Sequence, residues 1–109
     1  METRDDIRLI LTTACNRDEA KRLARALVEE SLAACATLIP GAHSIYRWQG
    51  QVEEADETLL LIKTTAERVE ALEIRLKELH SYETPELLAL RVESGSHAYL
   101  QWLVECTQG

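Results

Sequence analysis

Glycine and proline are scarce in this sequence, with four glycines and two prolines among 109 residues. The glycines are scattered, so the chain lacks a glycine-rich loop of the kind that binds phosphate groups. No apolar run approaches the length of a membrane span, and residues 1–6 are too polar for a secretion signal. These absences lead us to expect a protein that neither enters a membrane nor carries an export leader.

Paired cysteine motifs are also absent. Cys15, Cys35 and Cys106 are odd in number and widely spaced, which argues against a zinc ribbon. Reduced thiols in a cytoplasmic protein are the simplest interpretation. The histidines form no close pair with each other or with a cysteine, so any metal site must be assembled by the fold. No nucleophile motif occurs, so we expect no enzymatic activity; catalysis by Cys35 with His80 is an alternative hypothesis.

Acidic charge and apolar residues are what the sequence does contain. The 19 acidic residues outnumber the 12 lysines and arginines, which gives a net charge of −7. This charge repels nucleic acid and anionic membranes and attracts cations. Apolar residues make up 46% of the chain, which is too many for a disordered protein. The length fits one domain over residues 1–109, with a core modest enough for self-association to add useful burial.

The hydrophobic pattern predicts alternating strands and helices. Strands are expected over residues 7–13, 34–49, 58–64 and 87–92, and helices over about 17–32, 69–80 and 99–104. Asn16 with Glu19, and Thr64 with Glu67, have the spacing of helix capping boxes. Pro40-Gly41 predicts a bulge or an edge position in the second strand, because proline cannot donate to a ladder. The acidic run 53–57 is expected to be a solvated hairpin region.

The order β-α-β-β-α-β, followed by a terminal helix, predicts an α+β, ferredoxin-like sandwich with both helices on one sheet face. Residues 59–62 and 87–90 are continuously apolar and lack the alternation of a strand with one wet face. We therefore expect both faces to be buried, the second by other copies of the chain. A monomer whose terminal helix covers that face is the alternative. On the oligomer hypothesis, aspartate at Leu60 or Leu61 should destroy assembly.

A series of short motifs gives the sequence a family resemblance. The series comprises Leu32-Ala33-Ala34-Cys35, Pro40-Gly41, Ser44, Tyr46, Trp48, Gly50, Glu57, Lys63-Thr64, His80-Ser81-Tyr82-Glu83-Thr84-Pro85-Glu86, Tyr99 and Trp102. In this order and spacing it resembles the CutA family of divalent-ion tolerance proteins, over nearly the whole chain. Cys15-Asn16, Ser81 and Arg91 depart from the family pattern at positions where proline is common, which affects loop stiffness and local charge.

The resemblance implies a ferredoxin-like fold, a homotrimer with sheets meeting edge to edge, and a cytoplasmic role in tolerance to divalent metals, copper in particular. Divalent metal ions and other copies of the chain are then the expected partners. The architecture is also similar to that of the trimeric PII signalling proteins, which bind small molecules in clefts between subunits. A signalling or scaffold trimer that responds to a small molecule is therefore the alternative function.

Cys35, His80 and Glu83 are the candidate metal ligands. The Cys35 thiol would suit Cu(I), although a buried cysteine often serves only as a small hydrophobic residue. His80 ends a helix, where the helix dipole favours its cationic form and capping is an equal alternative to metal binding. Glu83 could bind a hard cation or form a loop salt bridge.

Tyr46, Trp48, Lys63, His80, Tyr82 and Glu83 are the candidate residues of a ligand cleft. Tyr46 and Trp48 share one strand face because they are two positions apart. They could form an aromatic wall of the cleft or simply pack in an interface. Lys63 could bind an anion, or pair with Glu57 or with an acidic residue of another subunit.

Overall fold

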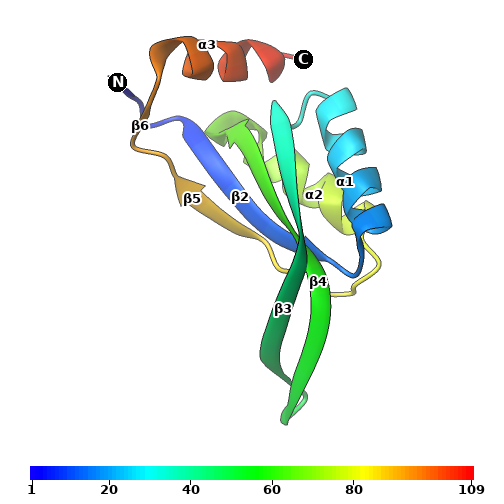
Figure 1. Ribbon diagram of the computed structural model, residues 1–109. Helices are drawn as coiled ribbons and strands as arrows, with labels where there is room; N and C mark the ends of the chain where they lie inside the picture. Colours follow the sequence, from blue (N-terminus) through cyan, green and yellow to red (C-terminus); the bar gives the residue numbers. More distant parts are fainter.

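The protein is an antiparallel sheet covered on one face by two helices (Figure 1). The computed structural model describes residues 1–109. The strands are β1 (Glu2–Thr3), β2 (Ile7–Ala14), β3 (Cys35–Trp48), β4 (Gln51–Thr65), β5 (Leu88–Arg91) and β6 (Ser94–Gly95); the helices are α1 (Arg17–Glu29), α2 (Val69–Leu79) and α3 (His97–Cys106), with a short 3-10 helix η1 (Ala66–Arg68) before α2. The main sheet has the order β3-β4-β2-β5. The predicted β-α-β-β-α-β sandwich with a C-terminal helix is confirmed.

One of the two predicted capping boxes forms in part, and the other is wrong. The Asn16 side chain accepts a hydrogen bond from the Glu19 N–H at 2.8 Å, as a cap should. The Glu19 carboxylate reaches back to the N–H of Cys15 rather than that of Asn16. Thr64 caps nothing, because its hydroxyl donates to the Leu32 carbonyl at 2.7 Å within the core. The buried hydroxyl bonds instead to the connection between α1 and β3, which lies beside it in the folded chain.

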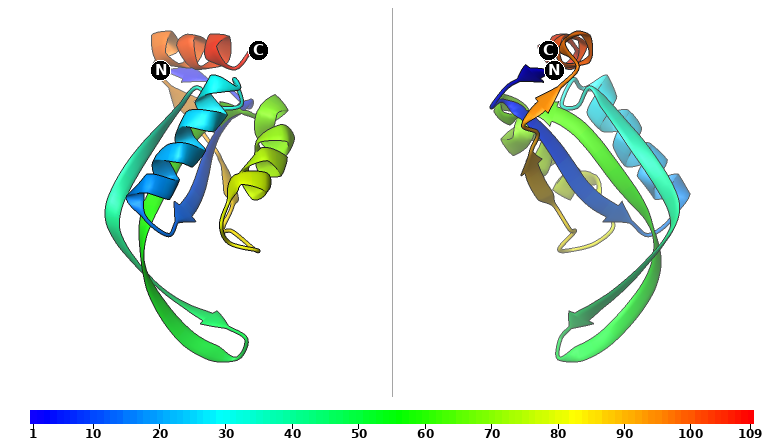
Figure 2. Two further views of the ribbon diagram at one scale, coloured as in Figure 1. Left: turned by 90° about the vertical axis from the view of Figure 1, so that its right-hand side faces the viewer. Right: turned by 60° about the vertical axis from the view of Figure 1, so that its left-hand side comes forward.

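β3 and β4 form a long ribbon that projects beyond the helices (Figure 2). The predicted bulge is confirmed at Pro40-Gly41, where the register shifts and Gly41 adopts a φ of +86°. The acidic run 53–57 lies in this hairpin as predicted, but it is already part of β4 and is paired with β3 along its length. The turn itself is Gln49-Gly50, where both residues have positive φ. Such a pair matches the right-handed twist of a two-residue hairpin.

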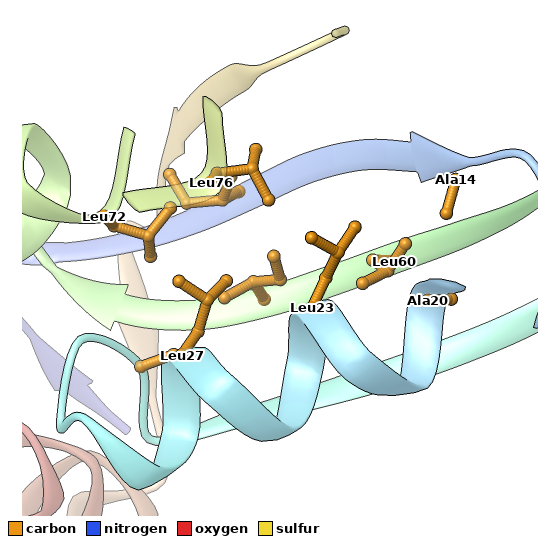
Figure 3. Close-up of a cluster of buried hydrophobic side chains, with 10 residues drawn as sticks. Ala14, Ala20, Leu23, Leu27, Leu60, Leu72 and Leu76 are labelled. Atoms are coloured by element: carbon orange, nitrogen blue, oxygen red, sulfur yellow. The ribbon is translucent and has the colours of Figure 1, made fainter. Parts of the chain in front are cut away.

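The covered face carries the main core (Figure 3). Leu23 and Leu27 of α1 and Leu72 and Leu76 of α2 meet the sheet and are at most 1% exposed. Their sheet partners are Ile10, Leu60 and Ile62, all fully buried. A smaller cluster of Ile7, Ala34, Leu100 and Leu103 joins α3 to one end of the sheet.

The opposite face of the sheet is open. The cross-strand partners Leu11, Leu61 and Leu88 share this face, and Leu88 is 55% exposed. The terminal helix α3 packs only over the end at Ile7, so it does not cover the face as the monomer alternative required. Leu60 lies in the helix-covered core, so the expectation that aspartate at Leu60 would test assembly is wrong. None of the helices combines the length and the hydropathy needed to span a bilayer.

Candidate functional site

The best candidate site is a cleft of about 680 Å³ between the projecting ribbon and the loop 80–86 that follows α2. Its walls include the aromatic rings of Tyr46, Trp48 and Tyr82 and the carboxylates of Glu57, Glu83 and Glu86. No lysine or arginine lines it. The cleft is therefore aromatic and negatively charged, and four of the six candidate cleft residues line it: Tyr46, Trp48, Tyr82 and Glu83.

The ribbon supplies one wall of the cleft. The alternation of β3 puts Tyr46 and Trp48 on one ribbon face, and both side chains are nearly half exposed. Glu57 of β4 reaches the same cleft from near the base of the ribbon. The bulge at Pro40-Gly41 lies just before this segment, where the ribbon departs from the rest of the sheet.

His80 anchors the loop rather than facing the cleft. Its buried ring contacts the Thr13 carbonyl through Nε2 at 2.7 Å, and Nδ1 accepts the N–H of Tyr82 at 3.0 Å. Nε2 must carry a hydrogen to donate to a carbonyl, and Nδ1 must lack one to accept. Both ring nitrogens are thus engaged within the chain, Nε2 as donor and Nδ1 as acceptor. His80 is also the C-cap residue of α2, which fits the capping alternative.

Glu19 holds the other side of the loop. Its carboxylate is 2% exposed and accepts the N–H groups of Cys15 at 3.0 Å and Ser81 at 2.8 Å. Burial alone would raise the pKa of Glu19, but hydrogen bonds from Ser81 and Cys15 outweigh it and lower the pKa to about 2. The sequence showed only a capping residue here, because Ser81 is too distant along the chain for any local pattern to reveal the contact.

Glu57 and Tyr82 form the polar centre of the cleft. The Tyr82 hydroxyl donates to Glu57 Oε2 at 2.8 Å, and Glu57 is 9% exposed. Burial and this hydrogen bond raise the pKa of Tyr82 well above its usual range, so the phenol remains a donor. The sequence predicts that Glu57 is a solvated residue or a partner of Lys63. Its place two positions before Leu59, on the same strand face, was the available signal.

Lys63 and Cys35 lie at the other end of the open face. Lys63 follows Glu57 by six positions in β4, roughly 20 Å at ~3.3 Å per residue. It donates to the Thr37 hydroxyl at 2.7 Å, so within the chain it does not pair with Glu57. Cys35 Sγ lies 3.5 Å from the Tyr99 hydroxyl, a contact that with burial raises the Tyr99 pKa to about 12.

The candidate metal ligands do not come together within one chain. Cys35 is next to Lys63 in the sheet, whereas His80 and Glu83 belong to the loop at the opposite end. Both ring nitrogens of His80 are already bonded. No group of three or more histidine, cysteine or acidic side chains is placed to hold a metal ion. The residues of a single chain therefore do not fit a metal, and Cys35 and His80 are not placed to act as a catalytic pair.

A second hollow, of about 770 Å³, lies beside residues 3–6 and 91–93. Its Arg4 is already paired with Asp6 at 2.7 Å and with Glu2 at 3.3 Å. It has a single apolar lining residue and no aromatic one. The cleft beside the ribbon is the better candidate because it combines a deep carboxylate with apolar walls.

Known proteins resemble this chain over almost all of its length. Residues 8–106 match the model of the CutA1 divalent ion tolerance protein family. A divalent-cation tolerance protein CutA from Thermus thermophilus is 48% identical over 99 residues, which cover 91% of this chain and 96% of that protein. A solved structure of the divalent cation tolerance protein Cut A1 from Thermus thermophilus matches with a TM-score of 0.91 at 48% identity, covering 93% of this chain and 98% of that one.

A structure of CutA from Synechococcus elongatus, complexed with a Bis-Tris molecule, also matches. It is 39% identical, has a TM-score of 0.89 and covers 96% of this chain and 97% of its own. The family match spans more than half of the chain, and the fold agrees with that of the solved structures. This chain belongs to the CutA family of divalent-ion tolerance proteins.

Proposed function

We propose that this protein acts in tolerance to divalent cations as a cytoplasmic, non-enzymatic homotrimer that binds a small ligand in the cleft of Tyr46, Trp48, Glu57 and Tyr82. The cleft is the observation that carries the proposal. It joins aromatic walls to a deep carboxylate, and its loop is fixed before any ligand arrives. The relative from Synechococcus elongatus, complexed with a Bis-Tris molecule, supports a site for small polar molecules in this family.

The homotrimer is supported by the open face. Leu88 and Leu90 are 55% and 42% exposed, and they continue the apolar surface of Leu9, Leu11 and Leu61. An apolar patch this continuous is rare on a monomeric protein and is usually covered by a partner. β3 and β5 are the edge strands of the sheet, so copies can also meet at their edges.

Direct binding of copper or another divalent metal is the second candidate. It is favoured by the cleft's excess of carboxylates and by the family of the chain. The ligands would have to come from more than one subunit, because a single chain offers no three-ligand group. Glu83 has no partner in the chain, whereas the reduced thiol of Cys35 would have to leave its contact with the Tyr99 hydroxyl and His80 would have to lose a hydrogen bond.

Native mass spectrometry without and then with stoichiometric Cu(II) tests both candidates. We expect a species of about three times the 12.3 kDa chain mass. Discrete copper adducts that disappear in Cys35→Ser and Glu83→Gln would support the metal candidate, and their absence would leave the small-ligand candidate. A monomer at micromolar concentration would contradict the proposal as a whole.

A further inference from the structure

We infer that the cleft recognises a small organic ammonium ion and that Glu57 is the residue that selects its positive charge. This inference rests on the ligand-binding function proposed above and adds the chemical class of the ligand. Three features carry it: a deep carboxylate without a cationic partner, aromatic walls around it, and a loop fixed in place by other parts of the chain.

The carboxylate of Glu57 has no cationic partner in the chain. It forms no salt bridge, and the Tyr82 hydroxyl is the single hydrogen-bond donor to its side chain, at Oε2. No fully buried side-chain oxygen lacks a partner, so the unbonded Oε1 must open onto the cleft. A carboxylate oxygen that faces an enclosed cleft without a counter-charge attracts a cation, and the partly enclosed setting strengthens that attraction.

The walls of the cleft suit an organic cation better than a bare metal ion. Tyr46 and Trp48 line the cleft, and aromatic rings attract ammonium groups through their negative faces. They offer no good ligand atoms to a divalent metal, which needs several oxygen, nitrogen or sulfur donors. Glu83 and Glu86 at the rim add negative charge, and no lysine or arginine in the lining opposes it.

The loop that closes the cleft is preorganised. Glu19 accepts the N–H of Ser81, His80 contacts the Thr13 carbonyl, and the Thr12 hydroxyl donates to the Glu86 carbonyl at 2.6 Å. Tyr82 is held from both ends, by His80 at its backbone and by Glu57 at its hydroxyl. Because the loop is already ordered, it loses little conformational entropy when a ligand binds, so even a small ligand can bind with measurable affinity.

Choline and its uncharged isostere 3,3-dimethyl-1-butanol are the probes for this inference. They have the same shape and differ in the charged nitrogen, so their comparison in the wild-type protein isolates charge without any mutation. Isothermal titration calorimetry of the full chain at low salt should show choline binding about tenfold or more tightly than the alcohol. Equal affinities, or no binding of choline to a protein that is trimeric, would overturn the inference and leave the trimer intact.

The Glu57→Gln variant tests the residue. It should lower choline affinity about tenfold or more and abolish the preference for choline over the alcohol, because the amide keeps the shape and loses the charge. Glu70→Gln is the matched control, since Glu70 is an exposed residue of α2 and its substitution changes net charge equally. That control should bind choline as the wild type does.

A second variant tests the inference independently in case Glu57→Gln does not fold. Trp48 is 48% exposed, so Trp48→Ala should fold normally and lose about fivefold in choline affinity through the missing cation–π contact. If Glu57→Gln instead weakens assembly while choline affinity is unchanged, another copy neutralises Glu57 and the inference is wrong. Binding of Cu(II) that depends on Glu57, without any binding of choline, would also overturn the inference. The ligand of the cleft would then be a metal ion and not an ammonium ion.

Discussion

Leu60 and Leu61 are neighbours in β4 and lie on opposite faces of one sheet, yet their surroundings differ completely. Leu60 is fully buried under α1 and α2, whereas Leu61 belongs to a face on which Leu88 and Leu90 are about half exposed. The chain completes one core by itself and leaves the second face open. Identical side chains on one strand therefore have different roles: Leu60 completes the core of the chain, and Leu61 is part of the surface that the proposed trimer would cover.

The largest expected effect separates these two requirements. Leu60→Asp puts an unpaired charge into the closed core and should leave no folded protein. Leu61→Asp puts the same charge on the open face and should give a folded chain that is monomeric, because the charge would be buried only in the trimer. Circular dichroism reports folding of each variant, and size-exclusion chromatography with light scattering reports its mass.

Each of the two variants has an outcome that would contradict the difference between the two sheet faces. A folded Leu60→Asp chain would mean that the helix-covered core tolerates charge and that the two faces differ less than their burial indicates. A trimeric Leu61→Asp protein would mean that the open face lies outside the assembly interface, and edge contacts of β3 and β5 would then have to hold the subunits together.

The second-largest expected effect is a loss of stability when the Glu19 carboxylate, at one end of the helix-covered face, is removed. Glu19 of α1 accepts the N–H of Ser81 just after α2, so it ties together the two helices that cover the sheet. Its pKa of about 2 lies below the ordinary 4.5, so the carboxylate contributes about 3 kcal/mol of stability. Because the folded-state pKa is lowered, this contribution is present above about pH 4.5 and is lost as pH falls towards 2.

Urea denaturation of wild type and Glu19→Gln at fixed protein concentration measures that contribution. We expect Glu19→Gln to be about 3 kcal/mol less stable at pH 7, with the difference shrinking as pH falls from 4.5 towards 2. The exposed substitution Glu70→Gln serves as the control and should change the free energy of unfolding by less than about 0.5 kcal/mol. If the loss of stability in Glu19→Gln stayed constant with pH, the charge of the carboxylate would not be the source of its contribution to stability.

The smallest effect compares another adjacent pair in β4. Thr64 is fully buried and donates to the Leu32 carbonyl, whereas Lys63 donates to Thr37 on the open face. Thr64→Val keeps the shape, leaves the carbonyl unpaired and should cost about 1–2 kcal/mol. Lys63→Ala should cost less than about 0.5 kcal/mol. Both free energies of unfolding are measured by urea denaturation in the monomeric Leu61→Asp background, where trimer contacts do not contribute. Equal losses of stability for the two variants would contradict the difference between the two sheet faces.

Local patterns predicted most of the fold. The periodicity of the apolar residues predicted every strand of the main sheet, and Pro40-Gly41 predicted the bulge in β3. The acidic run 53–57 was predicted to be a solvated hairpin region that precedes the strand, and it lies in the β3–β4 hairpin but already belongs to the strand. The run has little strand propensity of its own, and its pairing with β3, whose isoleucine and aromatic residues favour strands, extends β4 through it.

The candidate site was harder to predict from the sequence than the fold was. Tyr46, Trp48, Tyr82 and Glu83 were predicted and do line one cleft. Lys63 lies at the other end of the sheet, because six strand positions carry it away from Glu57. His80 was predicted either to face a ligand or to cap a helix, and it is the C-cap residue of α2 with its ring bonded to the Thr13 carbonyl. Such contacts join residues more than sixty positions apart, and no local pattern encodes them.

Residue types at fixed spacings along the chain were enough to establish the order of the elements, the two apolar sheet faces and the family. They could not establish which face is left open, which carboxylate stands deep in the cleft or whether the nitrogens of His80 are free to bind. Those features depend on how distant segments pack, and a hydrogen bond such as that between Tyr82 and Glu57 exists only after β4 and the loop beyond α2 have come together.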